Sequence, residues 1–214
     1  MKGWAVLLDF DGTMTTHDVS DALLARFGGL TLKEILASYG TEVSVAAWMR
    51  RKFLRVRRPA GELERYALRT VRPRAGLAAF LRACRARRVP VEVVSGGLDL
   101  YLDPLLARWG FAGLPRWRAT TRRTSRGLVV RYPFLRGCGI EEFKRRRVLA
   151  HRRRGRRVLF VGDGTGDLRA ARAADAVFAR AHLLRHCRRA GVPARPLRGF
   201  DAVRRYLEIP CSPR

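Results

Sequence analysis

Residues 4–16 read WAVLLDFDGTMTT, an apolar run that ends in two aspartates, Asp9 and Asp11, followed by glycine and threonine. A continuous apolar run is typical of a strand covered on both faces, as in a parallel sheet. Carboxylates at the end of such a strand are costly to bury without a partner. Asp11-Gly12 is also ordinary turn chemistry. The stretch therefore leaves two interpretations open: a strand ending in a turn, or a strand that carries two carboxylates into a site.

Two further runs have the same form, VPVEVVSGG at 89–97 and RVLFVGDGTGD at 157–167, and both end in small or acidic residues. Two weaker strands are expected at 174–180 and 191–197. Amphipathic helices are expected between the strands, at 75–88, 99–110, 141–154 and 167–174. This alternation predicts an α/β fold in which helices cover both faces of a parallel sheet. Ligands bind at the carboxyl ends of such strands, where the polar clusters fall.

Two segments interrupt the alternation. Residues 17 to about 72 indicate several helices in succession with no strand between them. Residues 115–134 alternate in polarity around Ser125-Arg126-Gly127, which predicts a β-hairpin. The expected organisation is a core made of 1–16 and 73–214, with a helical insertion at 17–72 and a hairpin insertion at 115–134.

The chain of 214 residues carries a formal net charge of +27, and only four of its 45 basic residues are lysines. A basic surface attracts nucleic acid and other polyanions. The arginines are spread over nearly the whole chain, however, and aromatic residues do not interleave with them as a base-stacking surface requires. A compositional bias towards arginine is therefore the favoured explanation. We expect nucleic-acid binding to be weak and non-specific if it occurs, while small anionic substrates are attracted.

The same composition indicates a soluble protein. No apolar stretch approaches the roughly 20 residues that span a bilayer, and no signal segment precedes the first strand. The four cysteines are far apart and form no CxxC pair, which is typical of free thiols in a reducing compartment. They are Cys84, Cys138, Cys187 and Cys211. A cytoplasmic protein without a membrane partner is predicted, whereas the oligomeric state has no signal in the sequence.

Four motifs stand in order along the chain: DxDGT at 9–13, Ser-Gly-Gly at 95–97, Lys144, and GDxxxD at 162–167. This order resembles the haloacid dehalogenase superfamily, and in particular its phosphoserine phosphatase-like phosphatases. The tail at 178–200 is similar to the branch that contains 2-hydroxy-3-keto-5-methylthiopentenyl-1-phosphate phosphatase. The resemblance implies a three-layer Rossmann-like core, with the insertion at 17–72 as a helical C1-type cap.

The resemblance further implies a phosphomonoester hydrolase that acts on a small phosphorylated metabolite through an aspartyl-phosphate. Such esters hydrolyse so slowly that catalysis must supply on the order of 20 kcal/mol. Asp9 is the implied nucleophile and a ligand of Mg²⁺, a cation that suits carboxylate oxygens. Asp11 is the implied general acid and base, and its main-chain carbonyl a further metal ligand. Asp163 and Asp167 are the other implied ligands, with Asp167 either binding the metal or orienting its shell.

The remaining motif residues are implied to hold the phosphoryl group. Ser95 and the amides of Gly96 and Gly97 would bind its oxygens, as backbone donors before a helix commonly do. The ammonium of Lys144 is a compact charge suited to the phosphoryl group and Asp9 together. Ser95 is alternatively a turn or capping residue, and Lys144 a solvated charge on a helix.

Other activities within the resemblance are less consistent with these residues. Haloacid dehalogenases lack the second aspartate of DxD, and P-type ATPases need membrane helices. A catalytically weak member that binds polyanions or nucleic acid stays open as an alternative, although the intact Asp9, Asp11, Lys144 and Asp163 set argues against it.

Departures from the resemblance leave the substrate open. GCGIEEFK at 137–144 keeps Cys138-Gly139 but lacks the second cysteine of the branch and reaches its lysine two residues later. Gly166 stands where phosphoserine phosphatases usually have asparagine. Some residues of the insertion are candidate residues of the cap or of its hinge, although each is as readily a helix cap or a solvated charge. These candidates are His17, Asp18, Asp21, Arg50 and Arg51.

Overall fold

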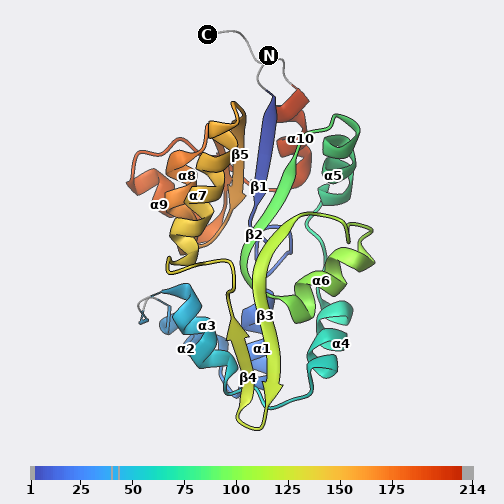
Figure 1. The fold of residues 1–214 in the computed structure, drawn as a ribbon, viewed down its shortest axis with the longest axis vertical. Helices are drawn as coiled ribbons and strands as arrows, with labels where there is room; N and C mark the ends of the chain where they lie inside the picture. Colours follow the sequence, from blue (N-terminus) through green and yellow to red (C-terminus); the bar gives the residue numbers. More distant parts are fainter. Residues whose placement is uncertain (1–2, 40, 43, 209–214) are drawn as a thin grey trace.

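The computed structural model describes residues 3–39, 41–42 and 44–208, whose strands form one seven-stranded sheet (Figure 1). The strand order is β4-β3-β2-β1-β5-β6-β7, and all neighbours are parallel except β3 and β4. The strands are β1 (Trp4–Leu8), β2 (Val91–Leu98), β3 (Arg116–Thr124), β4 (Gly127–Arg131), β5 (Arg157–Gly162), β6 (Ala176–Ala179) and β7 (Arg195–Pro196). The predicted α/β fold with a mostly parallel sheet is confirmed.

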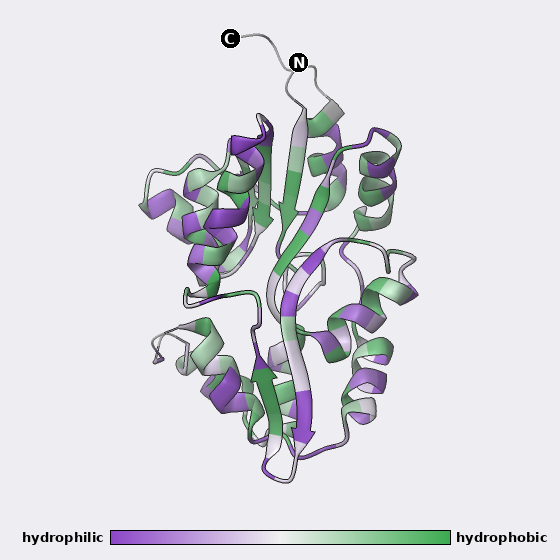
Figure 2. Cartoon of the chain, viewed as in Figure 1, coloured by the Kyte–Doolittle hydropathy of each residue, from purple (hydrophilic) through white to green (hydrophobic). Residues whose placement is uncertain are grey.

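β1 lies at the centre of the sheet because it pairs with β2 on one side and β5 on the other. Its residues alternate between two buried layers. Val6 and Leu8 pack in the larger core, whereas Leu7 packs in the other. Burial on both faces explains why the strand is apolar throughout rather than alternating. Figure 2 shows these central strands in green between helices striped with purple.

Helices cover both faces of the sheet. In Figure 1, α7, α8 and α9 lie on one side of β1 and β5, and α5 and α10 lie on the other. The helices of this core are α5 (Leu77–Ala86), α6 (Asp99–Arg108), α7 (Ile140–Arg153), α8 (Leu168–Ala173), α9 (Ala181–Arg189) and α10 (Phe200–Glu208), with a short 3₁₀ turn η1 (Thr165–Asp167) before α8. Phe80 of α5 and Phe200 of α10 pack together with their ring centroids 5.1 Å apart. The core therefore has three layers.

The described part of 17–72 consists of helices and the turns between them. These helices are α1 (Val19–Phe27), α2 (Leu32–Ala37), α3 (Val45–Phe53) and α4 (Ala60–Thr70). Polar caps start the first three of them, since Asp18, Thr31 and Ser44 each accept a hydrogen bond from a backbone amide in the first turn. An antiparallel bridge between Thr15 and Pro73 brings the two ends of this insertion together.

β3 has a larger role than the sequence indicated. Its first half pairs in parallel with β2, with Val94 opposite Trp117, and only its second half pairs with β4 as the expected hairpin. The hairpin tip reaches the insertion at the end of α3. Gly127 has a φ of +131°, and a Cβ atom there would overlap with the carbonyl of Leu54, so the contact requires glycine.

Within the described residues, none of the helices has both the length and the apolar character that crossing a membrane requires. Cys84, Cys138 and Cys187 are free thiols, as expected, and Cys211 lies outside the described residues.

A buried carboxylate, Glu92 on β2, joins the sheet to α7. It accepts hydrogen bonds from Arg147 (Nε 2.6 Å, Nη2 2.9 Å), from Trp117 Nε1 (2.5 Å) and contacts His151 Nε2 at 3.0 Å. Burial alone would raise the pKa of Glu92, but the bonds from His151 and Arg147 outweigh it and lower the pKa to about 2. The ionised form is therefore the one that stabilises the fold.

Replacing Glu92 by glutamine is expected to lower the free energy of unfolding at pH 7 by about 3 kcal/mol, the equivalent of the pKa shift. Because the folded-state pKa lies below the unfolded value of 4.5, the stabilisation is complete above that pH and is lost as the pH falls towards 2. Urea unfolding of the wild type and of Glu92→Gln between pH 7 and pH 3 measures this difference in the free energy of unfolding. Glu142→Gln, which removes a surface carboxylate from α7, should change stability by less than about 1 kcal/mol. A difference between wild type and Glu92→Gln that does not shrink with falling pH contradicts this account.

Candidate active site

The eight residues singled out in the sequence line one cavity of about 440 Å³ at the carboxyl ends of β1, β2 and β5. These strands are neighbours in the sheet, so the polar residues that follow them meet at one edge. The eight residues are Asp9, Asp11, Ser95, Gly96, Gly97, Lys144, Asp163 and Asp167. The opposite wall comes from α1, α2 and α3 of the insertion.

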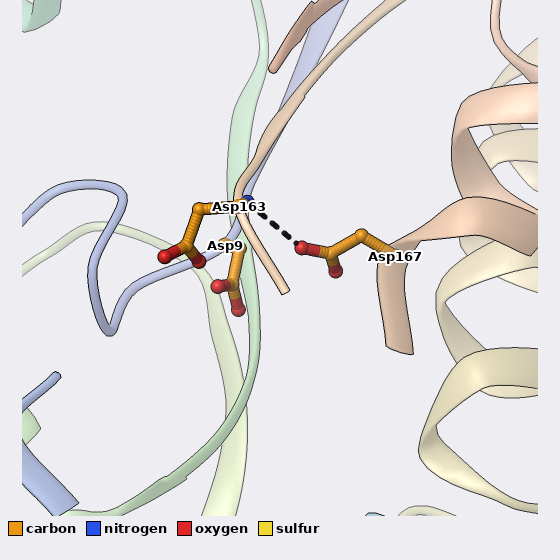
Figure 3. A group of neighbouring side chains, drawn as sticks. All are labelled: Asp9, Asp163 and Asp167. Carbon is orange, nitrogen blue, oxygen red and sulfur yellow. Dashed lines mark hydrogen bonds between the residues drawn. The ribbon is translucent and has the colours of Figure 1, made fainter. Parts of the chain in front are cut away.

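Asp9, Asp163 and Asp167 form an acidic cluster in this cavity. One carboxylate oxygen from each lies within 4.8 Å of the others. Figure 3 shows the side chains of Asp9 and Asp163 next to each other, with Asp167 reaching them from η1. Burial raises the pKa of Asp9 to about 6 and raises the pKa of Asp163 well above its usual range. Two buried carboxylates and a half-buried one this close together need a cation, and an all-oxygen set of this kind fits Mg²⁺.

The carboxylate of Asp167 is fixed by the backbone that precedes η1. Its Oδ2 accepts hydrogen bonds from the amides of Asp163 at 3.1 Å and Gly164 at 3.0 Å. Only its Oδ1 faces the other members of the site, where it contacts Lys144. Asp167 is thus oriented more tightly than a side chain on an open loop.

Lys144 connects two members of the cluster. Its Nζ donates to Asp9 Oδ1 at 2.7 Å and to Asp167 Oδ1 at 2.6 Å, and the residue is 5% exposed. Burial alone would lower the pKa of Lys144, but Asp167 and Asp9 outweigh it and raise the pKa. α7 begins at Ile140, which places Lys144 in its second turn. The ammonium group therefore stays charged beside Asp9.

Asp11 is held by two donors that the sequence did not reveal. Its Oδ2 accepts from Tyr101 Oη at 2.6 Å, and its Oδ1 from the amide of Val19 at 3.1 Å. Tyr101 is fully buried on α6, and its hydroxyl also lies 2.8 Å from Ser20 Oγ. Burial raises the pKa of Asp11 well above its usual range. Burial thus makes the protonated form more accessible than in a free aspartate, as a general acid requires.

Gly97 makes this arrangement possible. A Cβ atom at Gly97 would lie 2.4 Å from Tyr101 Oη and 2.5 Å from Asp11 Oδ2. Both distances are too short for carbon and oxygen atoms that are not bonded. The second glycine of the Ser-Gly-Gly motif therefore leaves room for Asp11 and Tyr101.

The glycine of DxDGT has a similar steric role. Gly12 has a φ of +67°, and a Cβ atom there would overlap with the carboxylate of Asp163. Thr13 Oγ1 donates to Asp163 Oδ1 at 3.2 Å. The buried guanidinium of Arg74 binds the carbonyls of this loop, with Nη2 2.6 Å from the oxygen of Gly12 and 2.7 Å from that of Thr15. Arg74 positions the loop and was not predicted.

The Ser-Gly-Gly segment is organised by internal bonds. The amide of Gly97 donates to Ser95 Oγ at 2.9 Å, and Tyr132 Oη donates to the carbonyl of Gly96 at 2.7 Å. The Gly97 amide is thus occupied, while the Ser95 hydroxyl has its own proton to donate. Ser95 is 1% exposed, so this proton is held at the base of the cavity.

The candidates in the insertion divide into two groups. Asp18 and Asp21 line the cavity, whereas His17, Arg50 and Arg51 are not among the described residues that line it. Arg51 forms an ion pair with Glu42.

Three comparisons with known proteins bear on the family and the fold of this chain. The profile of the haloacid dehalogenase-like hydrolase family matches residues 6–172. The chain is 31% identical over 219 residues to 2-hydroxy-3-keto-5-methylthiopentenyl-1-phosphate phosphatase of Geobacillus kaustophilus, covering 97% of this chain and 99% of that protein. It is also 31% identical to the bifunctional enzyme MtnB/MtnX of Bacillus licheniformis, covering 97% of this chain but spanning only 50% of that relative.

Solved structures agree on the fold. A phospho-aspartyl intermediate analogue of phosphoserine phosphatase superposes with a TM-score of 0.76 at 20% identity, covering 96% of this chain and 99% of the other. A substrate-bound phosphoserine phosphatase complex superposes with a TM-score of 0.73 at 18% identity, covering 96% and 98%. The matched profile covers most of the sequence and includes all eight site residues. The chain belongs to the haloacid dehalogenase-like hydrolase family.

Proposed function

We propose that this protein is a Mg²⁺-dependent phosphomonoester hydrolase that acts on a small phosphorylated metabolite through a phosphorylated Asp9. The observation that carries the proposal is the contact of Lys144 with Asp9 and Asp167. This contact lies at the carboxyl ends of the strands, where Asp11 can also be protonated. The relatives whose names describe phosphatases support the same reaction class.

The metal site would consist of Asp9, Asp163 and Asp167, with the main-chain carbonyl of Asp11 as a further ligand. Bound Mg²⁺ supplies positive charge that offsets the repulsion between the carboxylate nucleophile and the phosphoryl group. Lys144 provides a second positive charge on the side of Asp9 that faces α7.

In the first step, a carboxylate oxygen of Asp9 forms a bond to phosphorus while the bond from phosphorus to the alcohol oxygen breaks. Asp11 donates its proton to that alcohol oxygen, so the substrate leaves as a neutral alcohol. In the second step Asp11 takes a proton from water, the water oxygen bonds to phosphorus, and Asp9 is released as a carboxylate. Ser95, the Gly96 amide and Lys144 would orient the phosphoryl oxygens in both steps.

The contact between Tyr101 and Asp11 gives a prediction for this mechanism. Tyr101→Phe removes the hydroxyl that orients Asp11 and is expected to lower kcat about 10-fold for alkyl phosphates, part of the usual contribution of a general acid. The loss should be smaller for p-nitrophenyl phosphate, because its leaving group needs little protonation. Steady-state kinetics with both substrates measure the difference. Tyr66→Phe, which removes a hydroxyl outside the cavity, should leave both rates unchanged, and an equal loss for both substrates with Tyr101→Phe would indicate a structural role instead.

The proposed function is tested by incubating the purified protein with Mg²⁺ and a panel of phosphate esters. The panel holds p-nitrophenyl phosphate, O-phosphoserine, 2-aminoethyl phosphate, sugar phosphates, nucleotides and 2-hydroxy-3-keto-5-methylthiopentenyl-1-phosphate. We expect phosphate release from at least one ester, loss of the activity with EDTA, and recovery with excess Mg²⁺. Absence of hydrolysis from every ester, together with nucleic-acid binding that persists at physiological salt, would favour a polyanion-binding protein.

The setting proposed for this activity is the cytoplasm, without a membrane partner. The partner is the small phosphorylated metabolite itself. Nucleic-acid contacts through the scattered arginines would be weak and would disappear as salt is raised.

A further inference from the structure

One carboxylate that lines the cavity has a buried oxygen without a hydrogen-bond partner in the part of the chain that the structure describes. Asp21, on α1, is 8% exposed and lines the cavity on the side of the insertion. Its Oδ2 accepts a hydrogen bond of 2.5 Å from Tyr39 Oη, but its Oδ1 is buried and has no hydrogen-bond partner among residues 3–39, 41–42 and 44–208. A buried acceptor without a partner costs free energy that a bound donor can recover. Asp21 therefore places a buried carboxylate, one oxygen of which is unpaired among the described residues, in the lining of the cavity.

A second carboxylate lies next to Asp21. Asp18 lines the same cavity and caps α1, with its Oδ1 accepting from the amide of Asp21 at 2.9 Å. Burial, and then the charge of Asp21, raise the pKa of Asp18 to about 7. Among the described residues, Asp9, Asp163 and Asp167 are the only group of three metal-binding side chains, so Asp18 and Asp21 belong to no second group of that kind. An organic cation is therefore the better match to this pair than a metal ion.

The positive charges near the cavity are engaged elsewhere. Lys144 is bound to Asp9 and Asp167, and burial lowers the pKa of His182, which favours its neutral form. No arginine occurs among the described residues that line the cavity, although nearly all of the chain's 45 basic residues are arginines. The wall formed by the insertion is thus acidic inside a strongly basic protein.

Aromatic side chains complete this wall. Tyr39 and Trp48 line the cavity with their ring centroids 5.2 Å apart, and Met49 lies beside them. Lys52 already lies over the ring of Trp48, its Nζ 5.9 Å from the centroid. The rings therefore offer apolar surface for a short carbon chain, and the carboxylates are the groups that recognise charge.

We propose that the alcohol portion of the substrate carries an ammonium group, which donates to Asp21 Oδ1 with Asp18 close by. The substrate class is an amino-alcohol phosphate without a carboxylate, because the described wall offers no arginine to bind one. This inference rests on the proposed phosphatase function and specifies its substrate. The phosphate end would lie at Ser95 and Lys144, and the ammonium end at α1.

An isosteric series tests the inference with the wild-type protein and Mg²⁺. The esters are 2-aminoethyl, 2-hydroxyethyl and n-propyl phosphate, with O-phosphoserine to test a carboxylate. We expect kcat/KM for 2-aminoethyl phosphate to exceed that of each of the other three by at least about 10-fold. A rate for the hydroxyethyl ester that equals or exceeds it would indicate a polyol substrate and overturn the inference. An equal or faster rate for O-phosphoserine would overturn it as well.

Variants then assign the selectivity to the carboxylate. Asp21→Asn keeps the size of the side chain and its acceptor for Tyr39 but removes the charge, so the ratio of kcat/KM between aminoethyl and hydroxyethyl phosphate should fall towards 1. Glu142→Gln, which removes a carboxylate outside this cavity, should leave the ratio unchanged. If Asp21→Asn does not fold, inhibition of wild-type p-nitrophenyl phosphate hydrolysis serves instead: ethanolamine should inhibit at least 10-fold more strongly than ethylene glycol.

Hydrolysis of p-nitrophenyl phosphate separates the two possible failures. If this ester is hydrolysed with Mg²⁺ but no preference for the amine is seen, the substrate inference is wrong and the phosphatase function stands. If none of the esters is hydrolysed, the phosphatase function is wrong and the substrate inference is overturned with it.

Discussion

Replacing Asp9 by asparagine is expected to abolish phosphate ester hydrolysis, with a loss in kcat of roughly 10⁴-fold or more, as for other nucleophiles. Asparagine has almost the same shape, but its amide is a poor nucleophile and cannot form the acyl phosphate. Lys144 keeps its contact with Asp167, so the fold should persist. Steady-state rates with a good substrate measure the loss in kcat, and circular dichroism shows whether the fold persists.

The matched control is Asp201→Asn, which removes an exposed carboxylate at the start of α10 and should retain wild-type rates. A second variant tests the intermediate directly. Asp11→Asn slows the attack of water, so labelled phosphate should accumulate on the protein and should be released by hydroxylamine, as an acyl phosphate is. Wild-type kcat in Asp9→Asn with any good substrate would show that Asp9 is not the nucleophile.

Replacing Asp163 by alanine is expected to raise the Mg²⁺ concentration needed for half-maximal activity by at least about 10-fold, because it removes one of three carboxylates that would hold the ion. A thermal unfolding measurement gives a readout that does not depend on turnover. Mg²⁺ binding to the folded wild type should raise its Tm in a concentration-dependent way, and this increase should be absent in Asp163→Ala.

Without Mg²⁺ the same substitution should not lower the Tm, because burial and the nearby Asp9 raise the pKa of Asp163 and make its charge unfavourable in the folded state. Asp201→Asn should show the wild-type response to Mg²⁺. Activity and a Tm response that survive both Asp163→Ala and exhaustive chelation would rule out the proposed metal site. Ca²⁺ should replace Mg²⁺ poorly, because its larger coordination shell disturbs the placement of the phosphoryl group.

The parts of the fold that were predicted are those with strong local signals. Strands β1, β2 and β5 are mainly apolar because both of their faces are buried, and their ends carry the motif residues. Because these three strands are neighbours in the sheet, their carboxyl ends lie together, and the position of the site could be predicted from the order of the strands. Lys144 stood out because lysine is rare in this chain. Membership of the haloacid dehalogenase-like family is confirmed by the matched profile.

The parts that were missed depend on contacts between distant residues. β3 is rich in arginine and threonine rather than apolar residues, which concealed its pairing with β2. Tyr101 lies within an apolar helix, where an aromatic residue is ordinarily part of the core. Arg74 binds carbonyl oxygens about sixty positions earlier, and nothing near it in the sequence distinguishes it from the other arginines. The unpaired oxygen of Asp21 is a property of packing alone.

The contact between Gly127 and Leu54 bears on how the cavity opens. An insertion joined to its core only by its two ends could rotate on them as a rigid lid. Here β3 runs from the parallel sheet to the end of α3, so the hairpin forms a third attachment. Rotation of the insertion would bend the hairpin formed by β3 and β4. Because Ala119 of β3 pairs with Leu98 of β2, next to the Ser-Gly-Gly segment, this bending would also displace β2. We therefore expect any opening of the insertion to be coupled, through this one strand, to the segment proposed to bind phosphate.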